Sequence, residues 1–159
     1  MNITIHEINE TNLQDAVRIY NSNEDFLRHH LAVSRIDEAF IRNEIKEMHD
    51  NGFVSTLIKL DGEAVAIMDY MPPRDGNDYL SLLMHINTKQ GSGLGSMLYK
   101  RFEQEMIDLG ATTIRIDVVN DYETNSKLFW EKMGFQAQGS ETLTWGQKTS
   151  QVVVMKKML

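Results

Sequence analysis

The amino-acid sequence predicts a single mixed α/β domain. In this fold, a mostly antiparallel sheet of about seven strands would be flanked by about four helices. Stretches whose apolar residues alternate with a period of two predict strands, and amphipathic stretches of helical period lie between them. The 159 residues include only two prolines and no internal repeat or linker-like segment. Residues 1–159 are therefore expected to form one domain.

The first half of the chain predicts a strand, two helices and a hairpin. Thr11 is expected to cap the first helix, with Gln14 at the capping-box position. Asp61-Gly62 is a turn pair that joins the two hairpin strands. The expected elements are a strand at 2–8, a helix between Thr11 and the polar stretch 21–25, a helix at about 36–48, and strands at 53–60 and 63–70.

The second half predicts a central strand at residues 79–86, because this stretch is almost continuously apolar. A strand–helix–strand unit across residues 79–119 predicts one right-handed parallel crossover in the sheet. The remaining expected elements are a helix from about Gly95 to Gly110, a strand at 112–119, a short helix at 125–133, and strands at 135–144 and 151–158.

The charge of the chain narrows the classes of partner that it is expected to bind. The net charge is −7 and the pI is about 5.2. Binding to a nucleic-acid backbone depends on clustered Lys and Arg, so nucleic acid is not the expected partner. An acidic surface favours a cationic acceptor through steering, although it serves solubility equally well.

The chain also shows no sign of membrane insertion or of thiol chemistry. No stretch reaches the roughly 18 apolar residues of a membrane helix. Residues 1–7 alternate like a strand and lack the pattern of a signal peptide. Zero cysteines exclude disulfides, thiolate metal sites and a cysteine nucleophile. We therefore expect a cytoplasmic protein with no membrane partner.

The most informative local pattern is a glycine-rich stretch, Gln90-Gly91-Ser92-Gly93-Leu94-Gly95-Ser96. It follows a predicted buried strand and opens an amphipathic helix. The first turn of a helix has N–H groups without intrahelical partners and the positive end of the helix dipole. Glycines let an anion approach this backbone, so the stretch predicts a phosphate site. The alternative is a glycine turn selected only for close helix–strand packing.

Two nucleotide-binding motifs do not fit this stretch. A Walker loop requires a Gly-Lys pair, and the chain contains none. A Rossmann turn requires glycine at a third position, which is Ser96 here. A generic nucleotide-binding domain is therefore the weaker hypothesis.

The spacing Gln-x-x-Gly-x-Gly, between a strand and a helix, resembles the acetyl-CoA pyrophosphate motif of the GCN5-related N-acetyltransferase family. About 40 residues later, Leu128-Phe129-Trp130-Glu131-Lys132-Met133-Gly134-Phe135 resembles the family's second signature, a short helix ending in Tyr-Glu-Lys-x-Gly-Phe. The order of the predicted elements is also similar, and the resemblance covers essentially the whole chain.

The resemblance implies acetyl transfer from acetyl-CoA, as co-substrate, to a primary amine bound in the same complex. The acceptor would be a small-molecule or peptide amine, and a homodimer is an open alternative to a monomer. A non-catalytic acyl-CoA sensor is the alternative function. No metal is implied: the adjacent His29 and His30 would point about 100° apart on a helix and have no third ligand at useful spacing.

The resemblance also places coenzyme contacts on this sequence. Strands four and five would diverge at a bulge, and one N–H of strand four would polarise the thioester carbonyl. The main chain of Met84, His85 and Ile86 would bind pantetheine, and residues Gln90, Gly91, Ser92, Gly93, Leu94, Gly95 and Ser96 would bind the pyrophosphate. Further implied coenzyme contacts are Asn120, Lys127, Lys132 and Trp130, with surface solvation as the alternative for the lysines.

The candidate proton-transfer residues depart from the family's pattern. The family's usual acid is a tyrosine, but that position is Trp130, whose indole does not release its proton. The family's asparagine seven residues earlier is also missing, since that position is Glu123, so Tyr122 beside it is the candidate acid. His85 is the first candidate base, with strand packing as the alternative role. Asp69 is the second, with a solvated strand end as the alternative.

The segment from Asn23 to Leu31 lies where the family builds its acceptor pocket. Glu24 and Asp25 would meet a cationic acceptor there, or would simply belong to a solvated polar loop.

Overall fold

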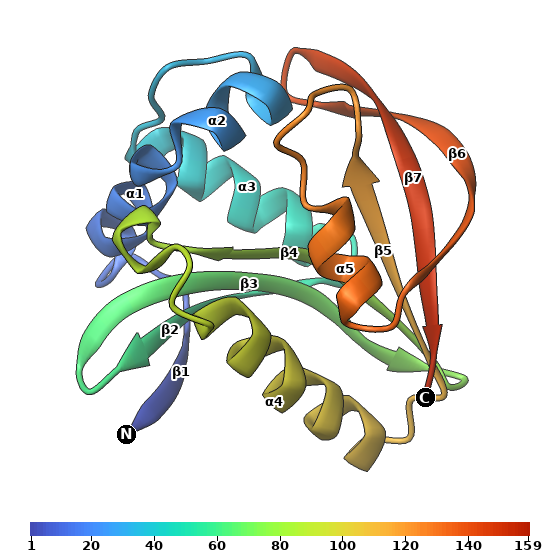
Figure 1. Ribbon diagram of the computed structural model, residues 1–159. Helices are drawn as coiled ribbons and strands as arrows, with labels where there is room; N and C mark the ends of the chain where they lie inside the picture. Colours follow the sequence, from blue (N-terminus) through green and yellow to red (C-terminus); the bar gives the residue numbers. More distant parts are fainter.

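A computed structural model describes residues 1–159 and confirms the predicted fold class, with a seven-stranded sheet and five α-helices (Figure 1). The strands are β1 (Ile3–Glu7), β2 (Val54–Leu60), β3 (Glu63–Arg74), β4 (Asn77–His85), β5 (Thr113–Val119), β6 (Gln136–Trp145) and β7 (Lys148–Met158). The helices are α1 (Leu13–Ser22), α2 (Glu24–Phe26), α3 (Glu38–Asp50), α4 (Leu94–Asp108) and α5 (Lys127–Lys132), with a π-helical turn at Leu27–Leu31 and a 3₁₀ turn at Asn87–Lys89.

The sheet has the strand order β1-β2-β3-β4-β5-β7-β6. Every neighbouring pair is antiparallel except β4 and β5, which are parallel and joined through α4, as the sequence predicts. The two parallel strands pair only where Asn77–Tyr79 lies beside Thr113–Arg115. Beyond Tyr79 no ladder joins them, and β5 continues alone along β7.

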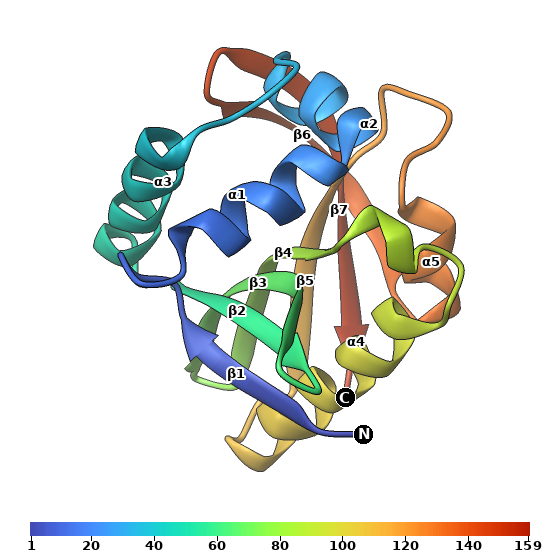
Figure 2. The ribbon, with the colours of Figure 1, turned by 90° about the vertical axis from the view of Figure 1, so that its left-hand side faces the viewer.

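Helices cover both faces of the sheet. Figure 2 shows α1 and α3 on one side, with α4 and α5 on the other. One apolar cluster of 33 buried residues includes residues of both layers. From α4 it takes Leu94, Leu98, Tyr99, Phe102 and Met106, which recur at helical spacing. Burial of each large apolar side chain contributes roughly 1.5–3 kcal/mol, so α4 and the turn before it are held firmly against β4. No helix has the length and apolar character needed to cross a bilayer.

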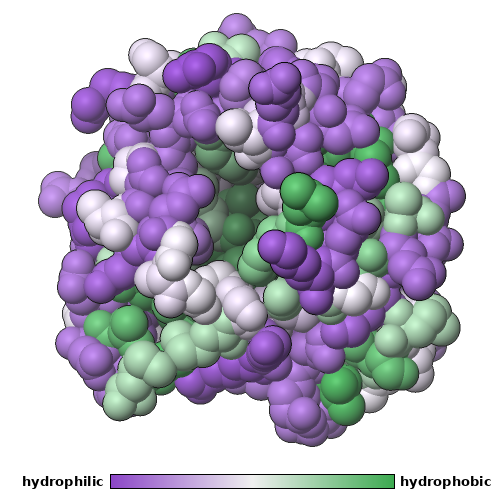
Figure 3. Space-filling model, viewed as in Figure 1, coloured by the Kyte–Doolittle hydropathy of each residue, from purple (hydrophilic) through white to green (hydrophobic).

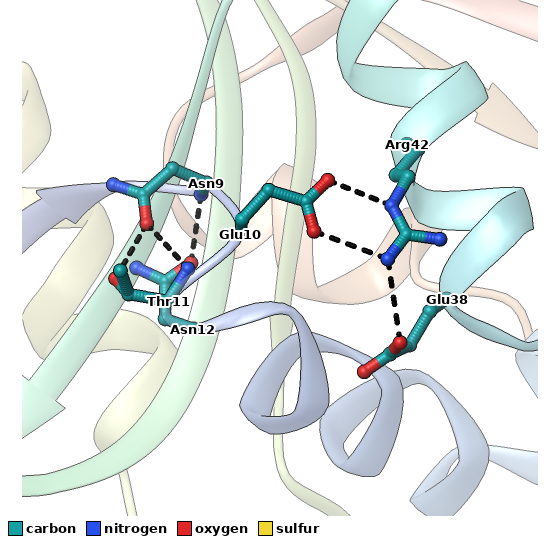
Figure 4. A network of polar contacts seen from close by, with 6 residues as sticks. All are labelled: Asn9, Glu10, Thr11, Asn12, Glu38 and Arg42. Carbon is teal, nitrogen blue, oxygen red and sulfur yellow. Dashed lines mark hydrogen bonds and ion pairs between the residues drawn. The ribbon is translucent and has the colours of Figure 1, made fainter.

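The start of α1 differs from the prediction. The cap position is Asn12 and no side chain caps the helix, so the predicted capping box at Thr11 and Gln14 is wrong. The Thr11 hydroxyl instead donates to Asn9 Oδ1 at 2.5 Å, while Asn9 N–H donates to Asn12 Oδ1 at 2.8 Å. These local bonds form a turn that competes with capping. Figure 4 shows this turn next to the ion pair described below.

The same turn is tied to α3 through Arg42. Its guanidinium donates to both carboxylate oxygens of Glu10, at 2.7 and 3.1 Å, and to Glu38 at 3.5 Å (Figure 4). All three side chains are exposed enough for water to screen them, so this pair fixes geometry more than it adds stability.

The segment after α1 is helical, whereas the sequence analysis favoured a polar loop there. Phe26, Leu27 and Leu31 turn toward the core, and Leu27 and Leu31 are fully buried. Asn23 supports the entry by donating from its side-chain amide to Ile19 O at 2.9 Å. The segment ends at Ala32, which has a left-handed backbone with φ of 57°. Apolar burial therefore outweighs the polar composition of the segment.

Candidate active site

The divergence of β4 and β5 opens a cleft in the sheet. Leu80 pairs with Tyr70 and Leu82 pairs with Asp69, which leaves Ser81 without a partner as a bulge that bends β4. The cleft has a volume of about 420 Å³ and is lined by 24 residues, 14 of them hydrophobic. Figure 3 shows a hollow with an apolar floor and a hydrophilic rim. The structure thus contains the bulge and the diverging strands that the sequence analysis expected.

The glycine-rich turn lies at one end of this cleft and is open to solvent, with residues 90–93 exposed. Gly91 and Gly93 have φ values of 75° and 83°, a conformation that strains other residues. The N–H groups of five residues donate to no acceptor within the protein: Gly91, Gly93, Leu94, Gly95 and Ser96. The first turn of α4 therefore presents a set of free donors at the positive end of the helix dipole.

Gly95 is a glycine that the fold does not require. Its φ is not positive, and a Cβ there would lie 3.6 Å from His85 Cδ2 and 3.7 Å from Phe129, which is ordinary contact. Neither backbone strain nor helix packing therefore explains this residue. Its missing side chain does leave the main-chain donors of the turn open to close approach by a ligand.

The main chain of β4 also carries free donors, but in a different phase from the prediction. Ile86 N–H donates to Val65 O at 2.7 Å, so this amide is not available to a ligand. Because N–H groups alternate in direction along a strand, Met84 N–H, opposite Ile67, faces β3 as well. The N–H groups of Leu83 and His85 then face the cleft. Leu83 was not among the predicted residues.

The His85 ring lines the cleft from the α4 side. Its Nδ1 lies 2.9 Å from Ile86 O. A carbonyl oxygen only accepts, so Nδ1 donates and Nε2 is left as the lone-pair nitrogen of the neutral ring. Nε2 has no hydrogen-bond partner in the protein. On the opposite side, Asn23 donates from its side-chain amide to His85 O at 3.1 Å and anchors this end of β4 to α1.

Tyr122 reaches the cleft in company with two histidines. Its hydroxyl lies 2.9 Å from His30 Nε2, and the His29 ring stacks on its own ring at 4.1 Å. Burial raises the pKa of Tyr122, and the carboxylates of Asp25 and Asp121 add to this effect. The hydroxyl therefore stays protonated at neutral pH. His30 was considered in the sequence only as a metal ligand, and the structure places it on the cleft wall.

Two carboxyl groups lie on the α1 and α3 side of the sheet. Glu44, on α3, lines the cleft and accepts from Trp145 Nε1 at 2.9 Å, and burial raises its pKa. Asp69 is 5% exposed and is absent from the cleft wall, so it is not the solvated strand-end group of the alternative reading. Burial raises the pKa of Asp69 to about 7, and its Oδ1 has no partner.

The other predicted contacts are divided between wall and surface. Trp130 is buried, lines the cleft and packs edge-on against Tyr99 and Phe135, so its indole is part of the core. Asn120 is exposed at the end of β5, with its N–H bonded to Gln151 O at 3.3 Å. Lys127 begins α5 and is half-buried away from the wall.

Four further residues that the sequence analysis named lie off the cleft wall. Asp25 sits 3.8 Å from Arg28, and Glu24 is exposed beside it. Gln90, by contrast, is on the wall. Lys132 and Glu123 are exposed. The cleft wall is built mainly from β4 and β5, with further residues from the segment 23–30, from α3, from the loop 122–126 and from the end of β6.

Comparison with known proteins agrees with this geometry. Residues 14–135 match the model of the acetyltransferase (GNAT) family. This range is more than half of the chain, and the chain belongs to that family. The predicted enzyme class, an acetyl-CoA-dependent N-acyltransferase, is thereby confirmed. A search of curated proteins finds no match.

Solved structures share the fold at low sequence identity. A chimeric spermidine N-acetyltransferase from Vibrio cholerae has a TM-score of 0.75 and 13% identity, over 99% of this chain and 96% of that chain. The ribosomal-protein-S18-alanine N-acetyltransferase of Escherichia coli has a TM-score of 0.69 and 16% identity, over 99% and 94%. A putative acetyltransferase from Salmonella typhimurium, solved with acetyl-CoA, has a TM-score of 0.65 and 16% identity, over 99% and 94%.

The burial of His30 gives a prediction about stability. Burial lowers the pKa of His30 from 6.5 to about 4, against an opposing effect of Asp121. The unfolded chain therefore binds a proton at His30 that the folded protein does not, and this contribution to stability falls as pH drops from 6.5 toward 4. Between pH 7.5 and 5.0 the loss from this group is about 2 kcal/mol.

The His30→Gln variant removes that group, so it should lose about 2 kcal/mol less than the wild type over this pH interval. Urea unfolding at pH 7.5 and 5.0 measures the difference. Parallel pH dependence in the two proteins would show that His30 is not held neutral by the fold.

Proposed function

We propose that the protein transfers the acetyl group of acetyl-CoA to a primary amine, with both substrates bound at once. The observation that carries this proposal is the set of unpaired main-chain donors along one continuous path. Five donors lie in the turn before α4 and in the first turn of α4, and two lie on β4 where its partner strand has diverged. A ligand with a diphosphate at one end and amide groups along its length fits that path.

The turn is suited to the pyrophosphate. The free N–H groups of the turn and the dipole of α4 supply positive potential for the diphosphate. Gly95 leaves these donors accessible. The acetyl-CoA bound in the Salmonella structure supports the same choice of ligand.

Strand β4 is suited to the pantetheine arm. The amides of pantetheine can pair with the cleft-facing groups of Leu83 and His85 as an added strand would. Acetyl-CoA supplies an acyl group activated by its thiol leaving group. A main-chain N–H aimed at the thioester carbonyl stabilises the charge that develops on its oxygen, which is an oxyanion-hole role.

Two side chains supply proton transfer in this proposal. An alkyl amine has a pKa near 10, so a base must remove a proton before the nitrogen can attack. His85 Nε2 is the unpaired acceptor on the wall and takes this role. The Tyr122 hydroxyl is the donor to the departing sulfur, a group with a pKa near 8.5 that needs little help. Asp69 lies off the wall and has no part here.

The pyrophosphate assignment predicts a loss of coenzyme affinity in Gly95→Glu. The backbone at this position accepts any residue, so the variant should fold, while the added carboxylate repels the diphosphate. We expect the Kd for acetyl-CoA to rise at least about tenfold, as a like charge at a helix N-terminus and lost access imply.

Isothermal titration of acetyl-CoA measures this affinity. Gly95→Ala is the matched control, because a Cβ fits there at ordinary contact distance and adds no charge. An unchanged Kd in Gly95→Glu, with the fold intact, would contradict the assignment.

The base assignment predicts that His85→Gln lowers kcat by about 10²–10⁴-fold, the usual contribution of a general base. The Kd for acetyl-CoA should change little, since the variant keeps the main-chain donor of residue 85. A steady-state assay that detects free thiol measures kcat, and titration gives the affinity. Full turnover in the variant would remove His85 from the mechanism.

A further inference from the structure

Charge is distributed unevenly over the cleft wall. Two of its residues are acidic, Glu44 and Asp117, and none is lysine or arginine. Asp117 is compensated, because Arg115 donates to it at 2.9 and 3.2 Å and the Tyr79 hydroxyl also bonds to it. Glu44 has no cationic partner within the protein. It is the one acidic group of the wall whose charge the fold leaves uncompensated.

Only one of the two oxygens of the Glu44 carboxylate forms a hydrogen bond within the protein. Its Oε2 accepts from Trp145 Nε1 at 2.9 Å, a bond that joins α3 to the end of β6. Its Oε1 has no hydrogen-bond partner. Burial raises the pKa of Glu44, because partial loss of contact with water disfavours the charged form. A bound cation would offset this effect.

Aromatic and apolar side chains surround this carboxylate. The Trp145 ring packs edge-on against Phe26 at 5.4 Å, and both rings line the cleft with Met48. The faces of such rings attract ammonium groups, and the rings exclude water. The wall near Glu44 therefore suits a cationic group carried on a methylene chain.

Asp69 is a second carboxyl group on this side of the sheet. It is almost fully buried on β3, its Oδ1 has no partner, and the charge of Glu44 helps to raise its pKa. Two acidic groups thus lie on the α1 and α3 side of the sheet, with no lysine or arginine on the adjoining cleft wall.

Glu44 lies apart from the proposed coenzyme path. The His85 ring and the turn before α4 are on the α4 side of the sheet, whereas Glu44 belongs to α3 on the other side (Figure 2). The cleft passes between them where β4 and β5 diverge. A cation at Glu44 is therefore separate from the nitrogen that meets the thioester beside β4.

We infer that the acceptor is a diamine-like molecule whose second, non-reacting ammonium group binds the free Oε1 of Glu44 against Phe26 and Trp145. This inference rests on the proposed acetyl transfer and adds the substrate class. The reacting amine then reaches the β4 side through an apolar methylene spacer. An acceptor that carries a carboxylate near its amine, such as a free amino acid, is disfavoured by the uncompensated charge of Glu44.

The test compares a diamine with a monoamine of equal chain length, 1,4-diaminobutane and n-butylamine. Each is titrated calorimetrically into the full-length protein saturated with coenzyme A, so the result does not depend on turnover. Variant Glu44→Gln keeps an oxygen that can accept from Trp145 and removes the charge. Variant Glu47→Gln is the matched control, because Glu47 is exposed on the same helix, outside the cleft wall.

The wild type should bind the diamine at least about tenfold more tightly than the monoamine, the effect of one charge-assisted hydrogen bond. Glu44→Gln should lose this preference, and Glu47→Gln should keep it. Equal affinity for both amines in the wild type, no binding of either, or an unchanged preference in Glu44→Gln would overturn the inference.

Coenzyme titration separates this outcome from failure of the proposed function. If acetyl-CoA binds and the diamine preference is absent, only the acceptor assignment fails. If acetyl-CoA itself does not bind to the wild type, the acetyl-transfer proposal fails with it.

Discussion

The cleft of this protein exists because the hydrogen-bond ladder between β4 and β5 ends early. β4 pairs with β3 from Asn77 to His85, interrupted by the bulge at Ser81 and a second register shift near Asn77, but its parallel pairing with β5 ends at Tyr79. A strand that loses a neighbour in the middle of a sheet keeps its N–H and C=O groups, and leaving such groups unpaired away from water costs about 1–3 kcal/mol each. The unpaired main-chain groups of β4 therefore favour a ligand that forms hydrogen bonds with them in the cleft.

The surrounding fold makes this arrangement stable. α4 is anchored by a row of buried apolar residues, and its first turn follows directly from β4 through a short 3₁₀ turn. The donors of the helix and those of the strand are thus held at fixed relative positions before any ligand arrives. Binding to such a preorganised path loses little conformational entropy, and donors aimed at a developing charge need no rearrangement during reaction.

Local patterns in the sequence were sufficient for the fold and for the helix end of the site. The period of the apolar residues predicted the strands, and the glycine spacing at 90–96 predicted the open turn, because both depend on neighbours close in the chain. The helix at Glu24–Leu31 was missed because its polar residues masked the buried spacing of Leu27 and Leu31.

Local sequence patterns could not predict features that depend on residues far apart in the chain. Which β4 amides face the cleft is decided by the register with β3, so the sequence could not single out Leu83 or show that the Ile86 amide is bonded to Val65 O. Glu44 looks like any acidic residue on a helix until Trp145, 101 residues away, holds its carboxylate. Asp69 was left open between a base and a solvated strand-end group, because its burial depends on elements distant in the sequence.

We propose that main-chain donors at Gly91, at residues 93–96 and on β4 hold the coenzyme. Hydrogen–deuterium exchange of backbone amides, with and without saturating acetyl-CoA, tests it most directly. We expect slower exchange at Gly91, at residues 93–96 and at Leu83 and His85, with the already bonded Ser92 and Ile86 amides unchanged. Equal exchange in both states across these residues would contradict it.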